Sequence, residues 1–311
     1  MPSPLLRRAA PAVATVFTLA TLAGCGSNSP DSSSQSGAPG GSANAVAAVQ
    51  INSAARKLLP ADVQSSQQLT LGATRVTGTS ALPHTGIQDG KEVGLDIDLR
   101  AAVAKSLGIT WKVQTGTFPT IVPGVQNGKY QVGQANFGVT KERLKIVDFA
   151  TYLNDGQAFV GSKQVKVQSV TKLSDVCGLK IATGSGTTFQ KLLETHKNEC
   201  AAQGKQPYTV QYFSDNAPIY LGLQNGKIDA YFGPTLSLKV LVKKLDGTRF
   251  LGQVTQTPVG FITAKGSPIA PALIAAINGL IKDGTYAKIF AKWGVPFSAI
   301  KQSQLNPRPT F

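Results

Sequence analysis

An arginine and a glycine-rich turn are the features of this sequence best suited to bind an anion. Arg143 ends the segment Thr140-Lys-Glu-Arg143, and its guanidinium offers a planar fork of donors that matches a carboxylate. A surface ion pair with Glu142 or Asp148 is the alternative role for this arginine. Gly184-Ser-Gly-Thr-Thr188 lies between an expected strand and an expected helix, where free N–H groups and the helix dipole favour an anion.

The other polar side chains do not form a recognisable catalytic or metal-binding set. Only two histidines are present, His84 and His196, and His196 falls on the apolar face of an expected helix, so a metal cluster is not expected. The sequence contains no HExxH, no P-loop, no Ser-His-Asp order and no full GxGxxG fingerprint. Asp155, Asp215 and Asp229 are isolated acids, of which Asp155 and Asp215 are candidate partners for an amine. We expect no catalytic residue, no metal and no cofactor.

Strands and helices alternate along residues 69–296, and this order indicates an α/β fold. The clearest helix is expected over residues 96–107, because Asp96 and Asp98 stand in its first turn and Gly108 follows its end. Two series of alternation with a return segment after residue 252 indicate two lobes joined by two crossings. Strands are also expected at 69–72, 109–113, 179–183, 208–213, 228–232, 249–251 and 259–263, and helices at 120–127, 187–201, 217–224, 236–245, 267–282 and 286–293.

The N-terminal residues predict export and a lipid anchor. Arg7 and Arg8 precede the uncharged stretch 9–23, which is shorter than the roughly 20 apolar residues that a membrane span needs, so residues 1–24 are interpreted as a signal peptide. The stretch ends in Leu22-Ala-Gly-Cys25, which resembles a bacterial lipobox. That resemblance implies lipidation of Cys25 and anchoring to the cell membrane on its extracytoplasmic side. A chance cysteine after an ordinary signal sequence is the alternative.

Residues 25–68 are expected to link the anchor to the folded part of the chain. The segment 26–44 consists largely of Ser, Gly, Asn and Pro, a composition typical of a flexible tether. Residues 45–59 are expected to form a peripheral helix that Pro60 stops. At the other end, residues 298–311 are expected to be a C-terminal tail.

Charge and cysteine count agree with a secreted protein. The net charge is +15, and removal of residues 1–24, which carry Arg7 and Arg8 and no acid, leaves +13. A basic protein could bind nucleic acid, but the secreted location and the lack of an arginine-rich run argue against such a partner. Beside Cys25 the chain has Cys177 and Cys200, and an even pair in an oxidising compartment indicates a disulfide, with two free thiols as the alternative.

Several segments, in order, resemble the polar amino-acid-binding family 3 of the extracellular solute-binding proteins of ABC transporters. They are Gly94–Leu99, Ile121–Tyr130, Thr140–Arg143 with Val147–Phe149, Leu221–Ala230, and Asp283–Tyr286 with Lys292–Gly294. The resemblance implies a two-lobed periplasmic-binding type II fold with a ligand cleft that closes by hinge motion. Lobe 1 would comprise residues 69–160 and 256–297, and lobe 2 residues 163–252. The placement of Cys177 and Cys200 and the segment Leu59-Pro-Ala61 are most similar to an actinobacterial lipoprotein branch.

The same resemblance implies a monomeric binding protein that captures an amino acid or a related carboxylate and delivers it to an ABC permease. An enzyme on the same fold, similar to a dehydratase, and a sensor subunit are the alternative functions. The first would need an acid–base pair in the cleft, and none is evident in the sequence.

The resemblance also assigns the carboxylate-binding site. Arg143 matches the family's carboxylate anchor, with the N–H of Gly138 and the hydroxyl of Thr140 in support, although Gly138 lacks the hydroxyl often found there. Thr187 and Thr188 would contact the same carboxylate from lobe 2. Asn136 either points into the cleft or serves a local turn.

Two positions depart from the family pattern. The family's aromatic turn is replaced by Ala81–Thr85, which places His84 where an aromatic ring is expected. Phe118 is therefore the leading aromatic candidate for contact with the solute, followed by Phe137 and Tyr152. A core role is the alternative for each of the three. Pro234 stands where the family has an aspartate for the solute's α-ammonium. Either Asp155 or Asp215 supplies that charge, or the solute lacks a free α-ammonium, and we favour such an atypical solute.

Overall fold

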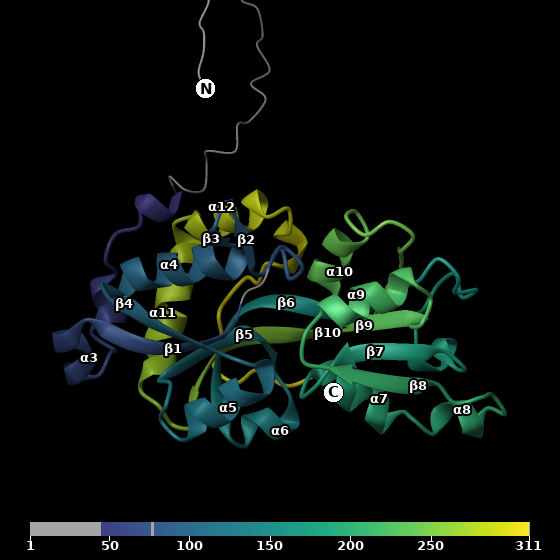
Figure 1. Cartoon of the computed structure of the whole chain (residues 1–311). Helices are drawn as coiled ribbons and strands as arrows, with labels where there is room; N and C mark the ends of the chain where they lie inside the picture. The colour runs from purple at the N-terminus through teal and green to yellow at the C-terminus, as the bar shows by residue number, and fades with distance from the viewer. Residues whose placement is uncertain (1–44, 76–77, 311) are drawn as a thin grey trace, which may run out of the picture. The chain divides into compact units, whose positions relative to one another are not determined.

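The structure, a computed structural model, describes residues 45–75 and 78–310. An eight-stranded sheet runs through these residues in the order β4-β1-β5-β10-β6-β9-β7-β8. Its two central strands, β6 (Val147–Gly161) and β10 (Arg249–Ala264), pair antiparallel along nearly their whole lengths. They run between two groups of elements, which lie on the left and the right of Figure 1 and are called lobe 1 and lobe 2 here.

Lobe 1 is built on parallel strands. β1 (Gln68–Thr74) pairs with β4 (Thr110–Gly116) on one side and β5 (Val132–Gly138) on the other. A small antiparallel hairpin is formed by β2 (Gly86–Gln88) and β3 (Lys91–Val93). The helices of this lobe are α2 (Ser53–Arg56), α3 (Ala61–Ser66), α4 (Leu95–Leu107), α5 (Phe118–Gln126), α6 (Lys141–Leu144), α11 (Ile269–Lys282) and α12 (Thr285–Lys292), and the 3-10 turn Pro296–Ser298 follows them.

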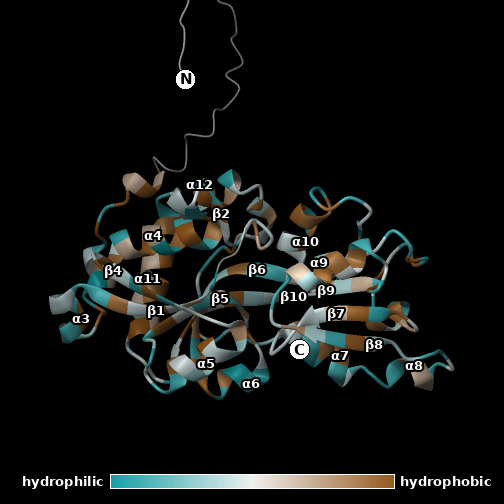
Figure 2. Ribbon diagram, in the orientation of Figure 1, coloured by the Kyte–Doolittle hydropathy of each residue, from teal (hydrophilic) through white to brown (hydrophobic). Residues whose placement is uncertain are grey.

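Lobe 2 repeats the parallel arrangement. β7 (Lys180–Gly184) lies between β8 (Thr209–Phe213) and β9 (Ala230–Pro234), and β9 joins the long strand β6. Its helices are the 3-10 turn Leu173–Val176, α7 (Thr188–Thr195), α8 (Glu199–Ala202), α9 (Ala217–Gln224) and α10 (Thr235–Leu241). Figure 2 shows hydrophobic stretches along the strands of both lobes, where separate buried clusters form the cores.

Local signals explain the best-predicted element. Helix α4 has Asp96 and Asp98 in its first turn, where the helix dipole favours negative charge, and Gly108 at φ 62° ends it. The prediction of a helix over 96–107 is confirmed to within one residue. The α/β alternation and the second crossing after residue 252 are confirmed as well.

The segment before β1 differs from the prediction. The single helix expected over 45–59 is broken, because only 45–47 and α2 are helical there. Ala55, Leu59 and Val63 are buried in the core of lobe 1, and the Arg56 guanidinium donates to the carbonyls of Leu107 and Gly108 at the end of α4. Residues 45–68 are therefore a packed part of lobe 1 rather than a peripheral appendage. The predicted signal peptide 1–24, Cys25 and the segment 26–44 lie outside the described residues.

The expected C-terminal tail packs against β6. The Asn306 side chain accepts from the N–H of Phe149 at 2.8 Å and donates to Asp148 at 2.7 Å. The Gln304 carbonyl accepts from Thr151, and Leu305 forms a bridge with Ala150. These contacts cover the side of β6 that β10 leaves open in lobe 1, which is why this segment packs.

Three further expectations concern lobe 2 and strand β10. The helix expected over 187–201 is divided into α7 and α8, and His196 at the break is half-exposed and bonded to Glu199 rather than packed in the core. The strands expected at 249–251 and 259–263 are one strand, β10. The disulfide is confirmed between Cys177 and Cys200, whose Cα atoms are 5.6 Å apart. Among the described residues, no helix combines the length and apolar character needed to cross a bilayer.

Candidate solute-binding cleft

A cleft of about 500 Å³ lies between the lobes. That volume is within the roughly 300–1,000 Å³ that is usual for small-molecule sites. Lobe 1 lines it with Arg143, Phe118 and Asn136, and lobe 2 with Thr188, Asp215 and Pro234, among others. With Thr187, which also lines the cleft, seven predicted candidates are therefore brought together from five separate segments of the chain.

Arg143 is held in the cleft by its own helix and by two aromatic rings. The Thr140 hydroxyl caps α6 by accepting from the Arg143 N–H at 3.1 Å, so Thr140 positions the arginine and is itself buried. The guanidinium carbon lies 5.5 Å from the ring centres of both Phe118 and Phe137. Its nitrogens donate to the carbonyl of Gly138 at 3.0 Å and, across the cleft, to that of Gly186 at 3.2 Å.

The described residues give Arg143 no counter-ion. Asp148, one partner considered for it, pairs with Lys265 at 2.8 Å, and Glu142 faces Lys191 at 3.5 Å. Burial lowers the pKa of Arg143 to about 10, against a smaller opposing effect of Glu142, so the guanidinium remains charged at neutral pH. A cation in a cleft without a carboxylate beside it is suited to bind an anionic ligand.

The glycine-rich turn approaches this arginine from lobe 2. Gly138 and Thr188 face each other: a Cβ at Gly138 would lie 2.8 Å from the Thr257 methyl and 3.4 Å from that of Thr188, so a larger side chain does not fit without a shift. Thr187 caps α7, because its hydroxyl donates to the Gly184 carbonyl at 2.6 Å and accepts from the Gln190 N–H at 3.2 Å. The first-turn N–H groups of α7 have no intrahelical acceptor and can bind an anion.

The aromatic candidates separate into two groups. Phe118 is partly buried and lines the cleft, where it packs against Phe137 at 4.9 Å between ring centres. Phe137 and Tyr152 are fully buried, and neither is among the cleft-lining residues. These two rings belong to the core, which was the alternative reading for them.

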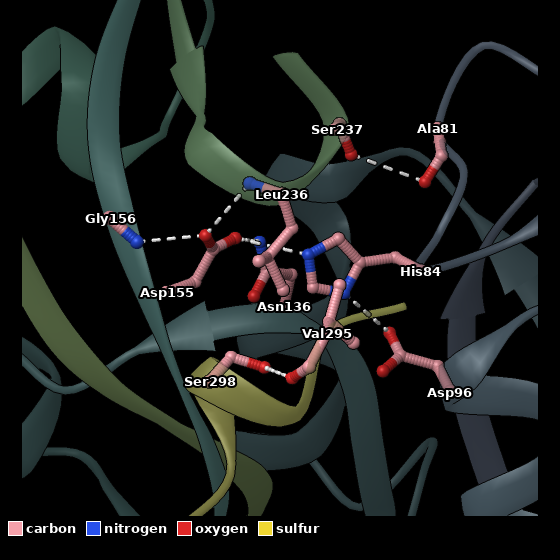
Figure 3. Close-up of polar contacts among 10 residues, drawn as sticks. All are labelled: Ala81, His84, Asp96, Asn136, Asp155, Gly156, Leu236, Ser237, Val295 and Ser298. Atoms are coloured by element: carbon pink, nitrogen blue, oxygen red, sulfur yellow. Dashed lines mark hydrogen bonds and ion pairs between the residues drawn. The ribbon is translucent and has the colours of Figure 1, made fainter. Parts of the chain in front are cut away.

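Asp155 stands where β6 passes from one lobe to the other, and it is fully hydrogen-bonded. One carboxylate oxygen accepts from the N–H groups of Gly156 at 2.7 Å and Leu236 at 3.2 Å. The other accepts from Asn136 Nδ2 at 2.9 Å and is 3.0 Å from His84 Nε2 (Figure 3). Because these four contacts use the four lone-pair positions of the carboxylate, the expectation that Asp155 pairs with a solute ammonium is wrong.

His84 lies between two carboxylates instead of stacking on a solute. It is 4% exposed, and its Nδ1 is 3.6 Å from Asp96 on the side away from Asp155. Burial alone would lower the pKa of His84, but the nearby charges and hydrogen bonds of Asp96 and Asp155 together raise it to about 10. The imidazole is therefore a positively charged link between the segment before β2, helix α4 and strand β6.

Pro234 faces the cleft at the N-terminus of α10. Asp215, which is exposed, is the acid that lines this cleft among the described residues, and one of its oxygens accepts from the Ala217 N–H at 2.7 Å. With Asp155 fully bonded, Asp215 is the remaining candidate for an α-ammonium.

Sequence reasoning missed a smaller cavity beside the cleft, called the side pocket here. It has a volume of about 110 Å³ and shares Asn136 and Pro234 with the main cleft. The residues that line it but not the main cleft include His84, Glu92, Asp96, Arg100, Thr115 and Gln134. Asp96 had an adequate explanation as a first-turn helix charge, so no local signal pointed to a pocket.

Comparison with known proteins shows the family of this chain. Residues 75–296 match the model of bacterial extracellular solute-binding proteins, family 3. The putative ABC transporter arginine-binding protein 2 of Escherichia coli is 32% identical over 65% of this chain and 81% of its own length. The arginine-binding protein ArgT of Corynebacterium glutamicum is 26% identical over 71% of this chain and 73% of its own.

A solved structure, an ancestral arginine-binding protein bound to arginine, superposes with a TM-score of 0.64 at 28% identity, covering 73% of this chain and 98% of that one. The expected α/β periplasmic-binding fold is thereby confirmed. These relatives are named as binding proteins and not as enzymes. The family match covers most of the chain, and the protein therefore belongs to the bacterial extracellular solute-binding proteins of family 3.

Proposed function

We propose that this protein is the amino-acid-binding component of an ABC importer, held at the extracytoplasmic face of the cell membrane by a lipid on Cys25. The observation that carries the proposal is Arg143, a charged guanidinium in the cleft with no carboxylate partner among the described residues. The family match and the names of the relatives support the class of solute, and the lipobox-like segment ending at Cys25 supports the anchor.

The solute carboxylate would connect the two lobes. Arg143 offers it a fork of donors from lobe 1, and the first turn of α7 offers N–H groups from lobe 2. The Arg143 contact with the Gly186 carbonyl shows that the two sides of the cleft come within hydrogen-bonding distance of each other. A carboxylate shared in this way favours the closed arrangement, because it binds best when both lobes reach it.

The positive charge of a solute α-ammonium can be accounted for in two ways in this cleft. Asp215 can pair with it from lobe 2, or the solute carries no free α-ammonium. Pro234 offers neither a carboxylate nor an N–H at the edge of the cleft. Pro234→Asp should therefore tighten the binding of ordinary α-amino acids, measured by calorimetry, and an unchanged affinity would favour Asp215 as the partner.

Arg143 is tested by substitution. Arg143→Ala should weaken solute binding at least thirtyfold, since the loss of one partner from a desolvated charge pair costs about 2–5 kcal/mol. Arg143→Lys should recover only part of the affinity, because a lysine keeps the charge but not the fork. Lys141→Ala, on the exposed face of the same helix, is the matched control. Near-normal affinity of Arg143→Ala with an unchanged circular dichroism spectrum rules out the proposed role.

The anchor is tested by fractionation. The wild-type protein should enter the detergent phase on phase separation, and Cys25→Ser should move it to the aqueous phase because no lipid can be attached. If the two forms fractionate alike, the protein is not anchored through Cys25.

A further inference from the structure

The segment 78–85, between β1 and β2, is fixed to lobe 1 by its backbone. The N–H groups of Leu95 and Asp96, at the start of α4, donate to the carbonyls of Pro83 and His84 at 2.8 and 3.0 Å. Backbone hydrogen bonds of this kind hold the segment on α4, so it moves with lobe 1 when the lobes open or close.

Lobe 2 reaches the same segment with two hydroxyl groups. The Tyr220 hydroxyl, on α9, donates to the Ser80 carbonyl at 3.0 Å. Ser237 Oγ, on α10, donates to the Ala81 carbonyl at 3.2 Å, and Figure 3 shows this second contact. Burial raises the pKa of Tyr220 to about 12, so its hydroxyl keeps the proton that it donates at neutral pH. Both hydrogen bonds therefore join one lobe directly to the other.

A third contact between the lobes involves a lysine and an exposed ring. Lys239 Nζ, on α10, lies 4.6 Å from the ring centre of Phe297 and 5.9 Å from that of Phe250. Phe250 belongs to β10, but Phe297 belongs to the turn that follows α12 in lobe 1, and it is 59% exposed. An ammonium over an aromatic face is attracted to it, so Lys239 links α10 to lobe 1 as well.

These three contacts lie outside the main cleft. Tyr220, Ser237 and Lys239 are not among the residues that line the cleft, whereas Ser80 and Ala81 are. The contacts therefore require that the lobes approach each other, but they do not require a solute. Interactions that exist in only one of two arrangements shift the population toward that arrangement.

We propose that Tyr220, Ser237 and Lys239 form a latch that keeps part of the solute-free protein in the closed arrangement. This inference goes beyond the proposed function, because it concerns the protein before any solute binds. The apparent dissociation constant of a ligand varies inversely with the fraction of protein that is in the binding-competent arrangement. The latch therefore strengthens the binding of every solute by the same factor.

Small-angle X-ray scattering of the solute-free full chain tests the latch without knowledge of the solute. The triple variant Tyr220→Phe, Ser237→Ala and Lys239→Met removes the three contacts and keeps most of each side chain. Each lost hydrogen bond should lower the ratio of closed to open molecules about fivefold. The triple variant should therefore have a larger radius of gyration than the wild type. Tyr220→Phe alone should give a smaller increase, which keeps the test valid if the triple variant does not fold.

A matched control removes two hydroxyl groups that act within lobe 2. The Tyr212 hydroxyl donates to Glu194 at 3.3 Å, and Thr248 Oγ1 donates to the Leu245 carbonyl at 2.6 Å. Tyr212→Phe with Thr248→Val should leave the radius of gyration at the wild-type value, because neither hydrogen bond joins the lobes.

Calorimetry with L-arginine and L-glutamine as probes provides a second measurement. The triple variant should weaken the binding of both amino acids by the same factor, at least fivefold, because the latch touches neither of them. Factors that differ between the two amino acids would contradict the latch, since side chains that contact the solute would produce them.

The scattering result separates this inference from the proposed function. Equal radii of gyration for the solute-free wild type, Tyr220→Phe and the triple variant overturn the latch, even if both amino acids bind. If neither amino acid binds but the triple variant is larger than the wild type and the control is not, the latch stands and the proposed function fails by itself.

Discussion

Asp155 should be one of the most sensitive positions for stability. It is 2% exposed and joins both lobes at the crossing strand β6. Asn136 and His84 reach it from lobe 1, and the Leu236 N–H at the start of α10 reaches it from lobe 2. Asp155→Ala would leave these donors buried and unpaired.

The expected loss of unfolding free energy in Asp155→Ala follows from the broken ion pair between Asp155 and His84. Removal of one partner from a buried ion pair typically costs about 3–5 kcal/mol, because the other charge stays buried without compensation. Native proteins have only about 5–15 kcal/mol of stability in total, so this loss is a large fraction of it. Asp155→Asn can keep an oxygen toward Gly156 and Leu236, but its amide group then faces two donors, and the loss should remain above about 2 kcal/mol.

Urea unfolding followed by circular dichroism measures the effect as a lower midpoint with an unchanged slope. Asp215→Ala is the matched control, because this aspartate is exposed and its side chain makes one hydrogen bond among the described residues; its cost should be below about 1 kcal/mol. If Asp155→Ala costs no more than Asp215→Ala, the carboxylate does not hold the crossing together and the reasoning fails.

Three further predictions concern stability. The pKa of His84 is raised from 6.5 to about 10 on folding, so protonation of His84 stabilises the folded state fully below pH 6.5, and this stabilisation is lost as pH rises through about 10. Urea unfolding of the wild type should show the loss of stability between pH 7 and 10, and His84→Gln should not show it. The disulfide joins residues 23 positions apart and so restricts the unfolded chain. The double variant Cys177→Ser with Cys200→Ser should therefore be less stable by roughly 3 kcal/mol, and its stability should not change with reductant. Equal stability of the variant and the wild type would contradict this argument. Gly72→Ala would place a methyl group 2.4 Å from the Tyr130 ring and should lower the unfolding free energy by about 1–3 kcal/mol; a midpoint like that of the wild type would show that the ring can move away.

Elements with strong local signals were predicted well. Helix α4 has acids in its first turn and a left-handed glycine at its end, and these signals depend only on neighbouring residues. The segment Thr140–Arg143 was likewise located from a few consecutive residues, although the short helix α6 that it forms was not predicted. The helices predicted over 45–59 and 187–201 were wrong because packing against the lobe cores decided those segments, and a single sequence carries little information about such contacts.

The sequence by itself was enough to derive the compartment, the α/β class, the family and the anion-binding role expected of Arg143. Each of these depends on short motifs, composition or periodicity. Only the tertiary structure decided the polar network beside the cleft. His84, Asp96, Asn136 and Asp155 come from separate segments, and nothing local shows that one imidazole lies between two carboxylates or that Asp155 has no free lone pair. Hydrogen-bond satisfaction and charge balance depend on which groups lie within about 3 Å of each other, and that is a property of the folded chain rather than of residue order.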